Sequence, residues 1–196
     1  MEQNQNFQSP QNEPQSQTAV AEMPAPPETA MEIDQVRLDM ILQKYKNEQN
    51  LTSGIITGLL AALIGAFVWS LITYFTSYQI GWMAVGIGFL VGYCVRTFGK
   101  GLDQSFGITG AVLSLFGCII GNLLTVCIVI AEQESAGVME VISYLNFGIA
   151  VELLIETFSF MDILFYGLAV YYGYKWSFVK MTDEELQSVM RPLSKA

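Results

Sequence analysis

Two carboxylates, Glu152 and Glu156, are spaced four residues apart, so that on a helix they share one face. Paired carboxylates can bind a cation or share a proton. The same spacing is also typical of the solvated side of a helix that lies at a membrane surface. Both interpretations stay open, and of the two we favour the solvated face.

Two further polar side chains interrupt apolar segments: Asn122 near the middle of one segment, and Arg96 at the end of another. An unpaired amide in hydrocarbon is costly, so we expect Asn122 to face another helix. It would act there as an interhelical hydrogen-bonding group or, alternatively, contact a substrate. Arg96 stands where a snorkelling anchor belongs, and Asp103 is a candidate partner for it or for Lys100.

The remaining reactive groups do not form a catalytic set. The chain contains no histidine, and the sequence offers no base that could activate Ser114. Three cysteines, Cys94, Cys118 and Cys127, lie in apolar segments without a C-x-x-C pair. Gly99-Lys100-Gly101 lacks the remainder of a phosphate-binding loop and is interpreted as a turn. We therefore predict no catalytic, cofactor-binding or metal-binding residue.

The composition indicates an integral membrane protein. Of the 196 residues, 52% are hydrophobic and 14% are charged, against about 25% charged in ordinary soluble domains. Residues 52–95 include no charged side chain, a run too long for a soluble protein to bury. The formal net charge is −9.

Four apolar segments predict an all-α, polytopic membrane bundle with transmembrane helices at about 51–75, 80–98, 106–131 and 160–178. Small residues recur at every fourth position, which on a helix forms a flat seam for a neighbouring backbone. Trp69, Tyr74 and Tyr78 predict an aromatic belt at the end of the first segment. The predicted packing residues are Gly54, Gly58, Ala62, Gly88, Gly92, Gly117 and Gly121.

The stretch 132–158 is apolar but acidic, and it has no basic residue. It predicts one or two amphipathic helices, broken near residues 146–148, that lie on the membrane or pack against the bundle. Capping boxes at Ser159–Asp162 and Thr182–Glu185 predict the starts of two further helices.

The N-terminal residues divide into two parts. Residues 1–30 are rich in Gln, Asn, Pro and Glu, lack the features of a signal peptide, and predict a disordered tail. Residues 31–50 carry Ile33, Val36, Met40 and Ile41 at helical spacing and predict an amphipathic helix. That helix would lie along the membrane surface, or pair with a partner or its own copy as a short coiled coil. At the other end, residues 180–196 predict a short helix and a tail.

The basic residues predict the orientation. With four spans, all nine Lys and Arg residues fall on one side of the membrane. The positive-inside rule then places both termini in the cytoplasm and residues 132–158 on the opposite side. A fifth span through 136–158 would carry Glu152 and Glu156 into lipid, at about 2.5–3.5 kcal/mol each. We therefore expect four spans.

The block Gly81-Trp82-Met83-Ala84-Val85-Gly86-Ile87-Gly88-Phe89-Leu90-Val91-Gly92, closing with Val95-Arg96, resembles a recurrent block in uncharacterised bacterial multi-pass membrane proteins. Residues 106–111 and 162–167 are similar to later segments of such proteins. The resemblance implies a four-helix fold in a bacterial inner membrane. The resemblance implies no activity, cofactor or residue role.

Three functions follow in order of preference. The first is a non-enzymatic structural or accessory protein that contacts the lipid bilayer and a protein partner through residues 1–50, with no role in nucleic-acid binding. The second is an oligomeric channel or small-solute transporter, built from several copies, in which Asn122, Thr57 and Ser114 line a polar path. The third is an intramembrane enzyme, for which the side chains are poorly suited.

Overall fold

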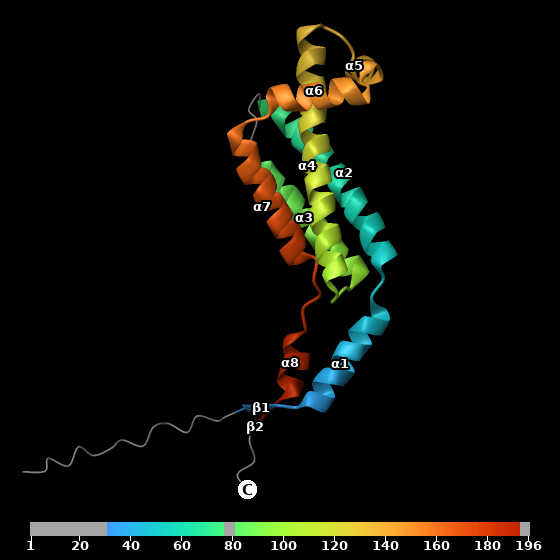
Figure 1. Ribbon diagram of the computed structural model, residues 1–196, viewed down its shortest axis with the longest axis vertical. Helices are drawn as coiled ribbons and strands as arrows, with labels where there is room; N and C mark the ends of the chain where they lie inside the picture. Colours follow the sequence, from blue (N-terminus) through green and yellow to red (C-terminus); the bar gives the residue numbers. More distant parts are fainter. Residues whose placement is uncertain (1–30, 77–80, 193–196) are drawn as a thin grey trace, which may run out of the picture.

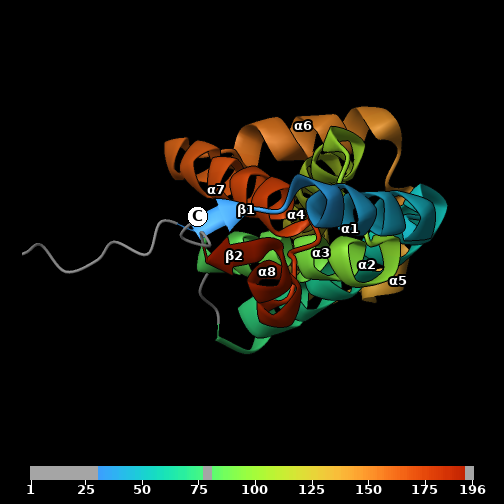
Figure 2. The same ribbon diagram turned by 90° about the horizontal axis from the view of Figure 1, so that it is seen from below.

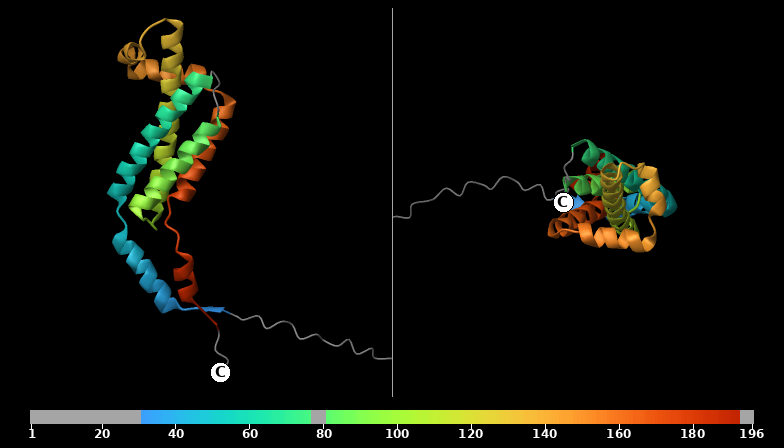
Figure 3. Two further views of the ribbon diagram at one scale, coloured as in Figure 1. Left: turned by 180° about the vertical axis from the view of Figure 1, so that it is seen from behind. Right: turned by 90° about the horizontal axis from the view of Figure 1, so that it is seen from above.

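Four helices lie side by side as an elongated bundle in the computed structural model, which describes residues 31–76 and 81–192 (Figures 1 and 3). They are α2 (Leu51–Thr76), α3 (Trp82–Gly99), α4 (Gln104–Gln133) and α7 (Phe160–Trp176). Their ends lie within two residues of the apolar segments expected from the sequence. The all-α class is confirmed. The expected tail 1–30, residue Tyr78 of the expected aromatic belt and the last four residues lie outside the described residues.

The pair α3 and α4 forms the middle of the bundle. Both helices contact α2 on one side and α7 on the other, and they also contact each other. The four helices alternate in direction along the bundle axis (Figure 1). Each of the two outer helices is therefore held by two neighbours.

Helix α2 buries small side chains and exposes large ones. Between residues 55 and 68, its large outward-facing apolar residues are 37–59% exposed: Ile55, Ile56, Leu59, Leu60, Leu63, Ile64, Phe67 and Val68. Its buried positions are Gly54, Gly58, Ala61, Ala62, Gly65, Ala66, Trp69, Ser70 and Thr73. A helix of a soluble protein has the reverse arrangement, whereas packing in lipid favours small residues at the interface.

Three helices, α2, α3 and α4, are long and apolar enough to cross a membrane. Together with the outward-facing apolar side chains, they indicate a membrane protein. Helix α7 has 17 residues and packs against α3 and α4. Two shorter helices, α5 (Val138–Tyr144) and α6 (Phe147–Thr157), would together be long enough to span, but they are bent by 111° relative to each other.

Glycines bring the helix backbones close together. A Cβ atom built at Gly88 of α3 would lie 2.8 Å from the Cα of Ala169 in α7. One built at Gly117 of α4 would lie 3.1 Å from the Cβ of Ala62 in α2. The other glycines of the expected seams are buried as well: Gly54, Gly58, Gly92 and Gly121. Little space remains between the helices at these contacts.

Helix α4 ends in a tight reversal at Ser135, whose φ of 51° is left-handed. The Ala136 N–H donates to the Ala131 carbonyl at 2.9 Å, and the Ser135 N–H donates to the Glu132 carbonyl at 3.4 Å. These two bonds form a Schellman motif. The chain then turns back into α5.

Helix α6 lies across the end of the bundle, where α4 projects beyond its neighbours (Figure 1). Its N-cap is Asn146, whose side chain accepts a hydrogen bond from the Ile149 N–H at 2.9 Å. The following helix, α7, starts with the capping box that the sequence predicted, in which Asp162 accepts from the Ser159 N–H at 2.7 Å. Local hydrogen bonds thus set both turns at this end.

The two ends of the described chain meet at the other end of the bundle (Figures 1 and 2). Strand β1 (Met31–Ile33) pairs antiparallel with β2 (Met190–Pro192), and α1 (Gln35–Glu48) packs against α8 (Asp183–Val189). Helix α8 starts with the second predicted capping box. We call β1, α1, α8 and β2 the terminal module. Helix α1 thus packs against the chain's own C-terminal helix, an arrangement that the sequence analysis did not consider.

Candidate functional site

A group of polar side chains lies inside the bundle, in the half nearer α6. Asn122 of α4 is 1% exposed. It lies next to Tyr166 of α7, whose hydroxyl interacts with the Asn122 side chain. Asp162 and Cys118 are further neighbours of Tyr166. Polar contacts of this kind join α4 to α7, because a polar group in a lipid-facing bundle is best satisfied by another helix.

The hydroxyl groups of Ser114 and Thr57, two side chains of the expected polar path, bond within their own helices. Ser114 donates to the Gly110 carbonyl at 2.6 Å, and Thr57 donates to the Ser53 carbonyl at 2.8 Å. Nucleophilic catalysis needs a hydroxyl activated by an adjacent base. Here the protons are engaged by the backbone, so Ser114 and Thr57 are neither poised as nucleophiles nor directed into a common path.

Trp69 occupies a different place from the one expected. The sequence analysis assigned it to an interfacial belt, but its side chain is 1% exposed. The reason is Gly121 on α4, where a built Cβ would lie 3.0 Å from the Trp69 ring. The missing side chain at Gly121 makes room for the indole. Tyr74, five residues further along α2, is 48% exposed.

Arg96 lies among aromatic rings at the end of α3. Its guanidinium is 5.7 Å from the centroid of Tyr93 and 5.8 Å from that of Trp176. The ammonium of Lys180 lies 4.9 Å from the Trp176 ring as well. Cation–π contacts of this kind position basic groups at a polar–apolar boundary. Sequence reasoning found Arg96 but missed Trp176 as its neighbour.

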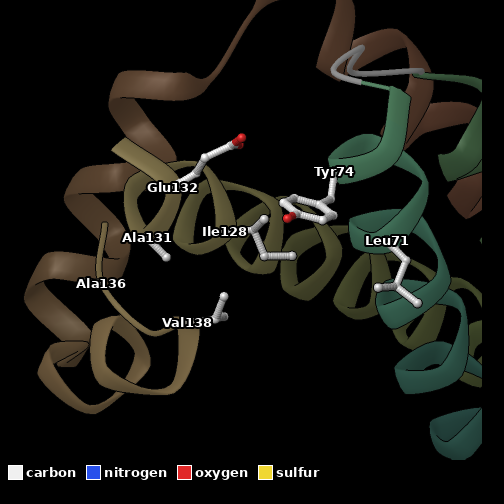
Figure 4. Close-up of a pocket in the computed structure, with 7 residues that line it drawn as sticks. All are labelled: Leu71, Tyr74, Ile128, Ala131, Glu132, Ala136 and Val138. Carbon is white, nitrogen blue, oxygen red and sulfur yellow. The ribbon is translucent and has the colours of Figure 1, made fainter. Parts of the chain in front are cut away.

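Three cavities of about 350–370 Å³ lie along the half of α4 that leads into α5. Figure 4 shows the one beside α2, in which the Tyr74 ring faces Ile128 and Glu132 lies above them. Its other lining residues are Leu71, Ala131, Ala136 and Val138. The third cavity lies between α4, α6 and α7 and is lined by Ile119, Val151, Leu154, Ile155, Phe158 and Tyr166.

The second cavity lies between α4, α5 and α6 and contains two carboxylates, Glu134 and Glu140. The rest of its lining is Ile130, Ala136, Val141, Tyr144, Leu145, Ile149 and Leu153.

Glu152 and Glu156, the pair singled out in the sequence, are exposed on α6 and do not line any of the three cavities. Within the described residues, no group of three or more His, Cys, Asp or Glu could hold a metal ion.

Sequence reasoning placed Glu134 and Glu140 in the acidic stretch but did not single them out. The signal that could have found them is their position on either side of the reversal at Ser135. A chain that turns back there must bring both sides of the turn together.

The terminal module is joined by a hydrogen bond of 2.6 Å from the Tyr45 hydroxyl to Glu185 Oε2. This bond to the carboxylate, with burial, raises the pKa of Tyr45 to about 12. The same bond, with those from Thr182, lowers the pKa of Glu185 to about 2. Lys44 lies 3.5 Å from the other oxygen of Glu185. The contact thus favours a protonated Tyr45 and an ionised Glu185.

The loop between α3 and α4 is held by the junction of α1 and α2. Lys100 pairs with Glu48 at 3.1 Å, and Gln49 donates to Asp103 at 2.7 Å. The sequence predicted Arg96 or Lys100 as the partner of Asp103. The structure shows Gln49 in that place instead. Lys100 itself has a left-handed φ of 49° at the end of α3 and belongs to a turn.

No protein-family model, curated protein or solved structure matches this chain. The function is therefore inferred from the residues and the fold themselves.

Proposed function

We propose that this chain is a four-span integral membrane protein of non-enzymatic function, a structural or accessory protein that binds a partner through residues 1–50. The observation that carries this proposal is the contrast between the two parts of the molecule. The bundle interior is filled by close helix contacts, whereas α1 and β1 expose Ile33, Val36 and Met40 to 52–69%.

The four spans of this proposal are α2, α3, α4 and α7. Helix α7 runs beside α3 and α4, while α6 lies across the end of the bundle (Figure 1). Residues 101–174 contain no Lys or Arg. The basic residues of the described chain belong to α1, to the segment 96–100, or to the chain from Lys175 onward. The positive-inside rule favours a cytoplasmic terminal module. The resemblance to bacterial multi-pass proteins favours a bacterial inner membrane.

The partner surface of this proposal is the outward side of α1. Tyr45 faces α8 and is buried, whereas Val36 and Met40, one turn apart, are 69% and 58% exposed. An apolar pair on a helix outside the bundle suits a helix or groove of a partner. The adjoining residues 1–30 would extend the contact.

The test is co-purification of the full chain from its native membrane after substituting Val36→Asp and Met40→Asp together. A stoichiometric partner should be lost. The matched control is Gln43→Asp with Asn47→Asp, which places the same charges at exposed polar positions of the same helix. Retention of the partner by both variants, or its loss from both, would count against the α1 surface.

The second candidate is an oligomeric channel or transporter, which the polar pair of buried Asn122 and half-buried Tyr166 favours. One bundle has no room for a pore where Gly117 approaches Ala62 and Gly88 approaches Ala169. A path would therefore need several copies. The mass of the protein in lipid nanodiscs gives its oligomeric state. A monomer would exclude the channel or transporter. For an oligomer, Asn122→Leu should abolish flux in liposomes.

A further inference from the structure

We propose that the cavity between α4, α5 and α6 binds a small amphiphilic organic cation, a molecule with one ammonium group and an apolar body. This cavity lies at the end of the bundle opposite the terminal module. The inference is therefore independent of the proposed partner surface on α1.

The cavity has the size and lining of a small-molecule site. It measures about 350 Å³, within the range of about 300–1,000 Å³ for ligand pockets. Its walls come from three helices, with Ile130 on α4, Val141 on α5 and Leu153 on α6. An apolar body of aromatic or short alkyl type would bury its surface against these side chains.

The charges around the cavity are all negative. Glu134 and Glu140 both line it and both are exposed, so they reach the solvent side. Between residues 101 and 174 the chain offers no Lys or Arg to neutralise them. Glu134 also caps the C-terminal end of α4, where the helix dipole is negative. The carboxylates and the dipole together favour a cation over a neutral or anionic ligand.

Tyr144 supplies the third element of ammonium recognition. It is the aromatic residue among the lining side chains and is 72% exposed. A tyrosine ring attracts an ammonium group over its face. Carboxylates, an aromatic ring and an apolar wall are thus combined in one cavity.

A phospholipid headgroup fits this site less well than a simple monocation. A phospholipid with an ammonium group also carries a phosphate, which would be repelled by Glu134, Glu140 and the neighbouring Glu132. We therefore commit to a free amphiphilic cation as the occupant.

The test measures binding of the probe benzyltrimethylammonium to the full chain in phosphatidylcholine nanodiscs. Calorimetry or saturation-transfer NMR detects the binding, and empty nanodiscs give the background. Neopentylbenzene, of the same shape without the charge, is the matched ligand. The variant Glu134→Gln with Glu140→Gln should weaken binding at least tenfold. Tyr144→Leu should weaken it several-fold while leaving both carboxylates in place.

The control variant is Glu152→Gln with Glu156→Gln, which removes the same charge from the exposed face of α6 outside the cavity. Unchanged affinity in this control, with weaker binding in the other two variants, supports the site. Equal weakening by both double variants would show only a diffuse surface charge and overturn it. Equal binding of neopentylbenzene would also overturn the proposal. So would a protein that does not bind the probe and co-purifies with an ammonium lipid.

Discussion

Single glycines decide how closely α3 and α7 approach. Gly88 faces the backbone of Ala169, which cannot rotate away as a side chain can. Two residues earlier, Gly86 is exposed and has nothing within 4 Å of a built Cβ. The same residue type thus has a packing role at one position of α3 and none at the other.

We expect Gly88→Ala to destabilise the bundle by about 1–3 kcal/mol, because the added methyl group forces the two backbones apart. Gly86→Ala is the matched control. It should be neutral or slightly stabilising, since alanine is the better helix former. Unfolding of both variants in a mild detergent, followed by circular dichroism, measures the difference. Equal stability of the two would contradict the close contact.

The Tyr45–Glu185 contact predicts a defined pH dependence of the terminal module. The pKa of Glu185 falls from 4.5 to about 2, so its contribution is complete above pH 4.5 and is lost as the pH falls towards 2. The pKa of Tyr45 rises from 10.0 to about 12, so its contribution is complete below pH 10 and is lost through pH 12.

Spin labels at Gln43 and Gln187, on the exposed sides of α1 and α8, would report this contact as a distance. We expect one short distance between pH 4.5 and 10, and a broader distribution below and above that window. Glu185→Gln should remove the acid transition, whereas Glu184→Gln should leave it in place. An acid transition that persists in Glu185→Gln would assign it to another group.

Among the elements, α4 ends in a way that its sequence does not favour. The left-handed position of the Schellman motif is usually glycine, and here it is Ser135. A left-handed conformation costs an ordinary residue roughly 1–2 kcal/mol, although glycine loses more entropy on folding.

We therefore expect Ser135→Gly to stabilise the protein by about 0.5–1 kcal/mol. The matched control is Ser143→Gly within α5, which should destabilise by a similar amount, because no left-handed conformation is needed there. Thermal unfolding of the two variants should show shifts of opposite sign. Destabilisation by both would mean that Ser135 does not adopt this conformation in solution.

On the scale of the whole molecule, the number of membrane crossings is open to a direct test. Cysteines introduced at Gln43 and Glu184 should be protected from an impermeant maleimide in intact cells, and one at Ser143 should react. The parent chain, with its cysteines at 94, 118 and 127, gives the background. If cysteines at 143 and 184 both react, α7 does not place the two positions on opposite sides of the membrane, and the four-span proposal fails.

The sequence was most informative where the signal is local. The helical class and the two capping boxes rest on neighbouring residues, and both predictions are confirmed. Tyr45 and Glu185 are 140 residues apart, and no periodicity connects them. Trp69 was assigned wrongly because its burial depends on Gly121, a residue of another helix. Such pairings become visible only once the helices are placed.

The pairing of β1 with β2 also has a consequence for biosynthesis. Residue 31 leaves the ribosome long before residue 192, with every helix of the bundle between them. The terminal module therefore cannot close until α8 and β2 have been translated. A chain stalled or truncated before Thr182 would leave Tyr45 without the Glu185 carboxylate and β1 without its partner strand. A closed module thus marks a chain that has been translated through β2.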